Sequence, residues 1–108
     1  MKSFREAEGY AADLQSAYDY YRTYSPAAAE RFLTAYFRAT KFIERTPLAC
    51  RLRRHGWRQM IIPGHPNYSI FYKELPFCWL YAAVIPTVRD PDVIQVRLLI
   101  REIGEEET

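Results

Sequence analysis

Residues 68–91, YSIFYKELPFCWLYAAVIPTVRDP, place two apolar runs on either side of a turn that contains proline. The first run, 68–73, alternates its side chains between two sides, which is typical of a strand with two different faces. The second run, 77–85, is apolar on both sides, as expected of a central strand. The stretch therefore predicts two paired strands in the middle of a sheet, and the chain leaves that sheet at Arg89.

The segment before this stretch predicts a third strand. Residues 57–62 also alternate, and the loop 63–67, PGHPN, cannot continue a strand because it contains two prolines and a glycine. The three runs together predict an antiparallel meander. A short strand at 2–5 could add an edge to it.

The N-terminal half has helical rather than strand periodicity. Within 10–24 one apolar stripe runs at spacings of four, three and four, and a second stripe follows Pro26. Ser25 is a typical N-cap, and proline is tolerated at the first helical position. Thr46-Pro47 ends the second helix. Because only two residues separate the two helices, they are expected to fold into an antiparallel hairpin. The stripes are Tyr10, Leu14, Ala17 and Tyr21, then Ala29, Phe32, Tyr36, Ala39 and Ile43.

The C-terminal segment opens with a helix start signal, Asp90 as N-cap and Pro91 at the first position. Val93, Val96, Ile100 and Ile103 then keep helical spacing up to Gly104, and residues 104–108 are expected to fray. A strand over 95–101 stays open as an alternative, because its apolar residues also alternate. The expected fold is α+β: one domain over residues 1–108, with an N-terminal helical hairpin packed on a small antiparallel sheet of three to four strands and a C-terminal helix.

Composition indicates a soluble globular protein of one domain. The 108 residues are 49% hydrophobic and 26% charged, and no apolar window reaches the length of a membrane span. The first ten residues contain acids where a signal peptide would be apolar. Cys50 and Cys78 form neither a disulfide framework nor a zinc motif. We therefore expect a cytoplasmic protein with reduced thiols and no membrane association.

Residues for ordinary enzyme chemistry are scarce. The two histidines, His55 and His65, have no sequence neighbours that suggest a catalytic triad or a metal site, and no glycine-rich phosphate loop exists. The carboxylate pairs Glu6/Glu8 and Asp13/Asp19 fall on helix or strand faces expected to be solvated. A hydrolase or a cofactor enzyme is disfavoured, and neither cofactor nor metal is expected.

A basic segment is the stronger signal. The segment from residue 38 to residue 58 contains seven cationic residues and one acidic residue, Glu44. The net charge of the whole chain is only +2. Such a segment attracts a phosphate backbone or an acidic protein segment, and six arginines to one lysine favour bidentate contacts. The alternative is a solvated helix end and loop. The cations are Arg38, Lys41, Arg45, Arg51, Arg53, Arg54 and Arg58.

The order of these elements resembles a known family. The run AADLQSAYDYYRTYSPAAAERFLTAYFRATKFIERTPLACR, followed by YSIFYK, LYAAVI and RDP, resembles the ParE branch of the RelE/ParE toxin superfamily over residues 4–99. These proteins are the toxins of bacterial type II toxin–antitoxin modules and are also met as plasmid-stabilisation proteins. No single element is diagnostic, and the combination along the chain carries the likeness. The elements are Ala12-Asp13-Leu14, Ala17, Tyr20-Tyr21, Pro26, Ala29, Phe32, Ile43, Pro47, Tyr72 and Arg89-Asp90-Pro91.

The resemblance implies one of two activities. RelE-like members cleave mRNA on the ribosome, using an arginine on the third strand, another after the fourth strand and a tyrosine near the C-terminus. Here those positions hold Ser69, Arg89 and a residue near Gln95, and no tyrosine follows Tyr81. ParE-like members instead inhibit DNA gyrase by binding, without a catalytic set. The departures favour the gyrase inhibitor.

Three functions therefore stay open. The first is a toxin that binds DNA gyrase and is neutralised by a cognate antitoxin. The second is a ribosome-dependent mRNA interferase with Arg58, Arg89 and His65 as catalytic candidates. The third is a non-toxic module that binds the antitoxin and helps it to repress transcription.

Site residues are predicted for the first function. Target binding is assigned to Arg89, Arg97 and Arg101, the last two on one helix face with the apolar stripe turned inward. Arg89 could equally form a structural pair with Asp90 or Asp13. Binding of antitoxin or phosphate is assigned to Arg51, Arg53, Arg54 and Arg58.

Overall fold

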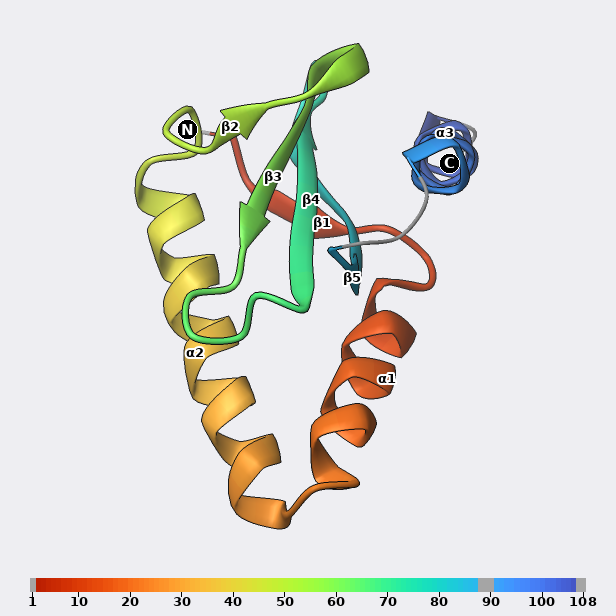
Figure 1. Cartoon of the computed structure of the whole chain (residues 1–108). Coiled ribbons are helices and arrows are strands. Elements are labelled where there is room, and N and C mark those ends of the chain that lie inside the picture. The colour runs from red at the N-terminus through yellow and green to blue at the C-terminus, as the bar shows by residue number, and fades with distance from the viewer. Residues whose placement is uncertain (1, 88–90, 107–108) are drawn as a thin grey trace.

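The computed structural model describes residues 2–87 and 91–106. An α-helical hairpin and a third helix surround a five-stranded sheet (Figure 1). The elements in chain order are β1 (Phe4–Glu6), α1 (Tyr10–Arg22), α2 (Pro26–Arg45), β2 (Arg51–Leu52), η1 (Arg54–Gly56), β3 (Trp57–Ile61), β4 (Tyr68–Glu74), β5 (Trp79–Pro86) and α3 (Pro91–Glu106).

The sheet has the order β1-β5-β4-β3-β2. The predicted antiparallel meander is confirmed as β3, β4 and β5. The predicted edge strand is β1, which pairs with β5 in parallel, so the sheet is mixed rather than purely antiparallel. The fifth strand, β2, was not predicted, because two residues carry no readable alternation.

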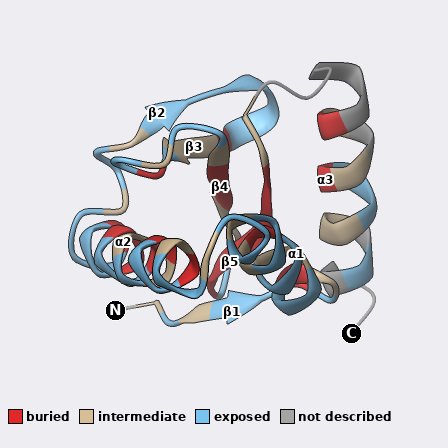
Figure 2. Cartoon of the chain, turned by 60° about the horizontal axis from the view of Figure 1, so that its bottom comes forward, coloured by how far each residue is buried: buried red, intermediate tan, exposed pale blue. Residues whose placement is uncertain are grey.

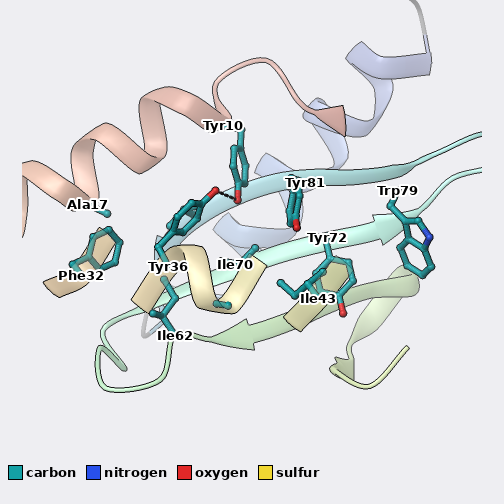
Figure 3. Packing of buried hydrophobic residues seen from close by; sticks show 12 residues of the cluster. Tyr10, Ala17, Phe32, Tyr36, Ile43, Ile62, Ile70, Tyr72, Trp79 and Tyr81 are labelled. Carbon is teal, nitrogen blue, oxygen red and sulfur yellow. Dashed lines mark hydrogen bonds between the residues drawn. The ribbon is translucent and has the colours of Figure 1, made fainter. Parts of the chain in front are cut away.

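The two faces of the sheet bury two apolar clusters. Alternation along β4 directs Ile70 and Tyr72 towards the helical hairpin and Phe71 towards α3. Figure 2 shows the buried sides of α1 and α2 turned to the sheet and α3 standing apart from them. In the hairpin cluster, the hydroxyl oxygens of Tyr10 and Tyr36 are 2.8 Å apart and hydrogen-bonded (Figure 3). The α+β fold with an N-terminal helical hairpin is confirmed.

The predicted start and end of α2 are confirmed. The Ser25 hydroxyl accepts a hydrogen bond from the Ala28 amide at 3.0 Å, so the predicted N-cap of α2 is confirmed. The C-terminal segment is a helix rather than a strand, but it continues past Gly104 to Glu106. The predicted N-cap Asp90 and the candidate Arg89 lie outside the described residues.

The face of α3 that packs on the sheet differs from the predicted stripe. Ile94 and Leu98 are buried against Phe71 and Ile85, whereas Ile100 is 63% exposed. Arg101 follows Leu98 at helical spacing and also turns inward. The prediction was wrong for Ile100, because α3 carries apolar residues on more than one side and its periodicity does not single out one of them.

A largely buried ion pair joins α1, β5 and α3. Arg101 Nη1 and Nη2 donate to Asp13 Oδ2 and Oδ1 at 2.6 and 3.1 Å, and Arg101 Nη1 also donates to the Ala82 carbonyl at 2.6 Å. The Asp13 carboxylate accepts a further bond from the Val84 amide at 3.1 Å. We call this arrangement the Asp13–Arg101 clamp. The prediction of a solvated Asp13 was therefore wrong.

The Asp13–Arg101 clamp provides hydrogen-bond partners for two backbone groups of β5. The pairing of β1 with β5 ends at Tyr81, and Ala82 is an extra residue in β5, since Phe71 pairs with Ala83 and Tyr72 with Tyr81. The Ala82 carbonyl and the Val84 amide therefore have no strand partner on the β1 side. Buried backbone groups need hydrogen-bond partners, and the two charged side chains supply them.

Because Tyr10 and Tyr36 are buried, the protein is expected to lose stability at alkaline pH. Burial raises the pKa of Tyr36 from 10.0 to about 12, and burial together with Tyr36 also raises the pKa of Tyr10. A raised folded-state pKa contributes stability that is complete below the unfolded pKa and is lost as pH rises through the folded one. We expect the free energy of unfolding to fall from pH 10.0 towards about 12.

Denaturant titrations across this pH range would measure the effect. Tyr36→Phe should flatten the decrease, since one of the shifted hydroxyls is gone. Tyr24→Phe is the matched control, because it removes a hydroxyl from a ring that is 70% exposed. Equal slopes in the parent protein and in Tyr36→Phe would contradict the assignment.

Candidate functional site: an arginine-lined groove beside α3

A groove of about 670 Å³ separates the β2 edge of the sheet from α3. Arginines form its rim, and apolar and amide side chains form its floor and its far wall. Its lining residues come from β2 and the turn after it, from β3, β4 and α3, and from the residue that follows β5. They are Arg51, Leu52, Arg53, Arg54, Gln59, Ile61, Phe71, Thr87, Ile94 and Gln95.

The turn after β2 holds the arginines on the rim. His55 and Gly56 both have positive φ, 60° and 81°, which reverses the chain directly into β3. The Arg53 amide donates to the Trp57 carbonyl at 2.6 Å, and its side-chain Nε donates to Gln59 Oε1 at 2.8 Å. Arg51, Arg53 and Arg54 are exposed, and none forms an ion pair with an acidic side chain in the described part of the chain. The rim is therefore a positive edge over a groove that can take an anion.

The floor of the groove is neutral and hydrogen-bonded. Gln59 Nε2 donates to the Ser69 hydroxyl at 3.0 Å, and the hydroxyls of Ser69 and Thr87 are 2.8 Å apart. Ser69 is fully buried and does not itself line the groove, but it joins the lining residues Gln59 and Thr87. The three side chains satisfy one another, so the floor offers polar contacts but no charge.

Arg58 stands apart from the other predicted anion-binding arginines. It is not among the residues that line the groove. Its Nη1 donates to the carbonyls of Leu48 and Cys50 at 3.2 and 2.9 Å, which braces the loop between α2 and β2. The hydroxyl of Tyr72 holds the same loop through the Pro47 carbonyl at 2.6 Å. The structure thus brings Arg51, Arg53 and Arg54 together and gives Arg58 a structural contact.

The two histidines also lie apart from each other. His65 sits in the turn between β3 and β4, edge-on to Tyr21 at 5.1 Å and to Phe32 at 5.7 Å. His55 lies at the other end of β3, in a second pocket lined by Trp57. His65 Nδ1 is buried and has no hydrogen-bond partner among the described residues. Arg58, near the start of β3, contacts the loop between α2 and β2, whereas His65, in the turn after β3, packs against the helical hairpin, so these two catalytic candidates do not form one site.

The predicted pair of target-binding arginines on α3 is not presented together. Arg101 is held in the Asp13–Arg101 clamp, and its side chain is 14% exposed, so the expectation of two solvent-facing guanidinium groups was wrong. Arg97 is half-buried and forms no ion pair with a described acidic side chain. Arg89 lies outside the described residues.

Sequence reasoning missed an apolar surface on α3. Leu99 and Ile100 are 53% and 63% exposed. The signal was present in the sequence, since the run Leu98-Leu99-Ile100 places apolar residues on more than one side of a helix. Gln59 and Thr87 of the groove floor were missed as well, and no spacing rule connects them.

Neither a metal-binding cluster nor a membrane-spanning helix is found within residues 2–87 and 91–106. No group of three or more His, Cys, Asp or Glu side chains there could hold a metal ion. No helix in this part of the chain has the length and apolar character needed to cross a membrane.

Two of three comparisons relate the chain to known proteins. A family model described as "ParE toxin of type II toxin-antitoxin system, parDE" matches residues 7–78. A solved structure titled "Chromosomal ParDE TA system from P. aeruginosa" is similar with a TM-score of 0.68 and 18% identity, covering 80% of this chain and 96% of that chain. A search of curated proteins found no match. The family match extends from just before α1 to the turn between β4 and β5.

Proposed function

Because the chain belongs to the ParE toxin family of type II toxin–antitoxin systems, we propose that it arrests bacterial growth by binding DNA gyrase and that a cognate antitoxin neutralises it. The match over residues 7–78 supports the toxin assignment. The choice of gyrase as target follows from the resemblance to ParE-like rather than RelE-like members, together with the groove chemistry described below.

The absence of charge on the groove floor is the observation that favours a toxin that binds its target over one that cleaves RNA. Cleavage of RNA needs cations around the reacting phosphate and a group that moves protons. At the strand position where RelE-like toxins have an arginine, this chain has Ser69, buried and hydrogen-bonded to Gln59 and Thr87. The last tyrosine, Tyr81, faces the helical hairpin and donates to Glu44 Oε2 at 2.8 Å. Burial and this carboxylate raise the pKa of Tyr81 well above its ordinary value, which makes it a poor proton carrier.

Growth arrest with two parallel readouts tests the proposal. The protein would be induced in a bacterial host, and plasmid supercoiling and mRNA 5′ ends would be followed together. We expect loss of negative supercoiling and no codon-positioned cleavage. Ribosome-dependent cuts at the rate of an active RelE-like toxin would overturn the assignment in favour of the mRNA interferase. Growth without arrest would overturn it in favour of the non-toxic antitoxin-binding module.

Arg97 provides the variant for this test. It is the one predicted target-binding arginine that the structure describes outside the clamp, so Arg97→Glu should abolish growth arrest and leave folding intact. Arg101→Glu cannot serve, because it would place a second carboxylate against Asp13 and disrupt the packing of α3. Full toxicity of Arg97→Glu would remove Arg97 from the target interface.

The groove rim is proposed to bind the antitoxin. Three exposed arginines above the apolar side chains Ile61 and Ile94 suit a segment that carries both acidic and aliphatic residues. Replacing Arg51, Arg53 and Arg54 with Ser should weaken binding of the cognate antitoxin about 10-fold or more at low salt and flatten its salt dependence.

Isothermal titration at low and high salt would measure this change. The matched control replaces Arg31, Arg38 and Arg45 with Ser, which removes the same charge from the outer face of α2. Equal losses in the two variants would show a general charge effect and contradict a specific role for the rim.

A further inference from the structure

The outer face of α2 carries a straight row of cations. Arg31, Arg38 and Arg45 recur every seven residues, and Lys41 lies between the last two. A seven-residue step returns to within about 20° of the same side of an α-helix. All four residues are exposed. At about 100° per residue they fall on the side of α2 opposite its buried residues Phe32, Tyr36 and Ile43. Figure 2 shows that α2 is exposed on the side turned away from the sheet. We call these four residues the α2 ridge.

The acids of α2 do not neutralise the ridge. The helix contains two acids, Glu30 and Glu44. Glu44 Oε2 accepts a hydrogen bond from Tyr81 on the sheet side at 2.8 Å, and Glu30 Oε1 accepts a long one from Tyr18 of α1 at 3.4 Å. No ion pair joins a ridge cation to an acidic side chain of the described residues.

Three cations elsewhere in the described residues form ion pairs, whereas those of the groove rim and Arg97 do not. Lys2 bonds Glu74, Lys73 bonds Glu102, and Arg101 bonds Asp13. An exposed helix usually interleaves charges of both signs at i and i+4, which stabilises the helix and limits its field. The α2 ridge departs from this pattern over its length and therefore attracts an anionic partner from outside the chain.

The shape of the ridge favours phosphate over peptide. From residue 31 to residue 45 it extends about 21 Å, with about 10 Å between successive arginines. Arg38, Lys41 and Arg45 line none of the described pockets. Peptide recognition uses pockets for side chains, whereas phosphate contacts need only exposed donors, which arginine provides in bidentate form.

A rigid row also suits a rigid partner. A duplex holds its phosphates at fixed intervals, so several cations fixed along one helix can be neutralised together, with release of counterions. A single strand would instead gain from stacking on exposed rings, and Phe37 and Phe42 flank the row at 54% and 39% exposure. Single-stranded DNA is therefore the comparison that the experiment must include.

We propose that the α2 ridge binds the phosphate backbone of duplex DNA without reading its sequence. This activity goes beyond the proposed inhibition of gyrase and uses other residues than the groove rim. It does not require gyrase or an antitoxin, so it is measured on the purified protein, and its failure leaves the proposed function untouched.

Fluorescence anisotropy with a labelled duplex of about 20 base pairs and arbitrary sequence, at salt from about 50 to 200 mM, tests the proposal. The protein would be made by cell-free synthesis to avoid toxicity. We expect a Kd in the micromolar range at the lowest salt. The plot of log K against log salt should have a slope of about −3 to −4, since each neutralised phosphate contributes about −0.9.

Two variants of equal charge separate the ridge from net charge. Replacing Arg38, Lys41 and Arg45 with Gln should weaken binding at least about 10-fold and reduce the slope by about 2 to 3. Replacing Arg51, Arg53 and Arg54 with Gln should retain most of the affinity and slope. Circular dichroism would confirm that both variants fold, as expected for substitutions at exposed positions.

Four outcomes would overturn the proposal. They are no binding by the parent protein at the lowest salt, equal losses in the two variants, tighter binding of a single strand of the same length, and tighter binding of polyglutamate of matched charge. The last outcome would assign the α2 ridge to an acidic protein partner.

Discussion

Replacing Phe32 with Ala is expected to lower the free energy of unfolding by about 3–5 kcal/mol. The side chain is fully buried in the hairpin cluster, where its ring stacks on Tyr21 at 4.8 Å between centroids and meets Tyr68 edge-on at 6.0 Å. A small domain has a total stability of about 5–15 kcal/mol, so the variant would lose a large share of it.

Urea unfolding followed by tryptophan fluorescence would measure the loss. Phe37→Ala is the matched control, because Phe37 lies on the same helix and is 54% exposed. We expect the control to cost less than about 1 kcal/mol. A cost below about 1 kcal/mol for Phe32→Ala itself would show that the hairpin does not depend on this ring.

Removing one partner of the Asp13–Arg101 clamp is expected to cost about 3 kcal/mol. Among the described residues, Arg101→Met would leave the Asp13 carboxylate, 11% exposed, with only the Val84 amide and would leave the Ala82 carbonyl without a partner. Because the clamp fastens α3 to the body, the amides of α3 should also exchange faster with solvent, and hydrogen exchange would detect this change.

A double-mutant cycle separates the clamp from simple packing. Asp13→Leu combined with Arg101→Met should cost clearly less than the sum of the two single variants, since no charge stays buried without a partner. The control is the more exposed pair Lys2–Glu74, whose side chains are 33% and 50% exposed and whose loss should cost about 0–1 kcal/mol. Strict additivity at Asp13 and Arg101 would contradict the clamp.

Short sequence patterns predicted most helices and strands of the fold. The structure shows the reason, because the contacts behind these patterns join residues that are close in the sequence. The stripes of the hairpin helices bury Tyr10, Phe32 and Ile43 as expected, because each helix packs a single continuous apolar stripe against the sheet. The Ser25-Pro26 start of α2 depends only on groups a few residues apart. Apolar stripes and N-cap residues can therefore be recognised in the sequence without knowledge of the rest of the fold.

The candidate site was predicted only in part. The arginine-rich segment 51–58 was found by composition, and the structure gathers three of its four arginines on one groove rim. Arg58 belongs to the same segment, but the alternation of β3 and the carbonyls of Leu48 and Cys50 direct it elsewhere. Charge density in a sequence indicates an attraction for anions and does not indicate the side on which each guanidinium lies.

The sequence by itself determined the family, the helical hairpin, the meander and the presence of a basic surface, since each depends on short-range periodicity or on composition. Only the tertiary structure decided the role of Arg101, whose partner Asp13 lies 88 residues away, and the inward face of α3. It also decided that Ser69 is enclosed by Gln59 and Thr87 from two other parts of the chain. The reason is physical: a buried charge or hydroxyl is stable only beside a partner that satisfies it, and folding alone brings that partner near.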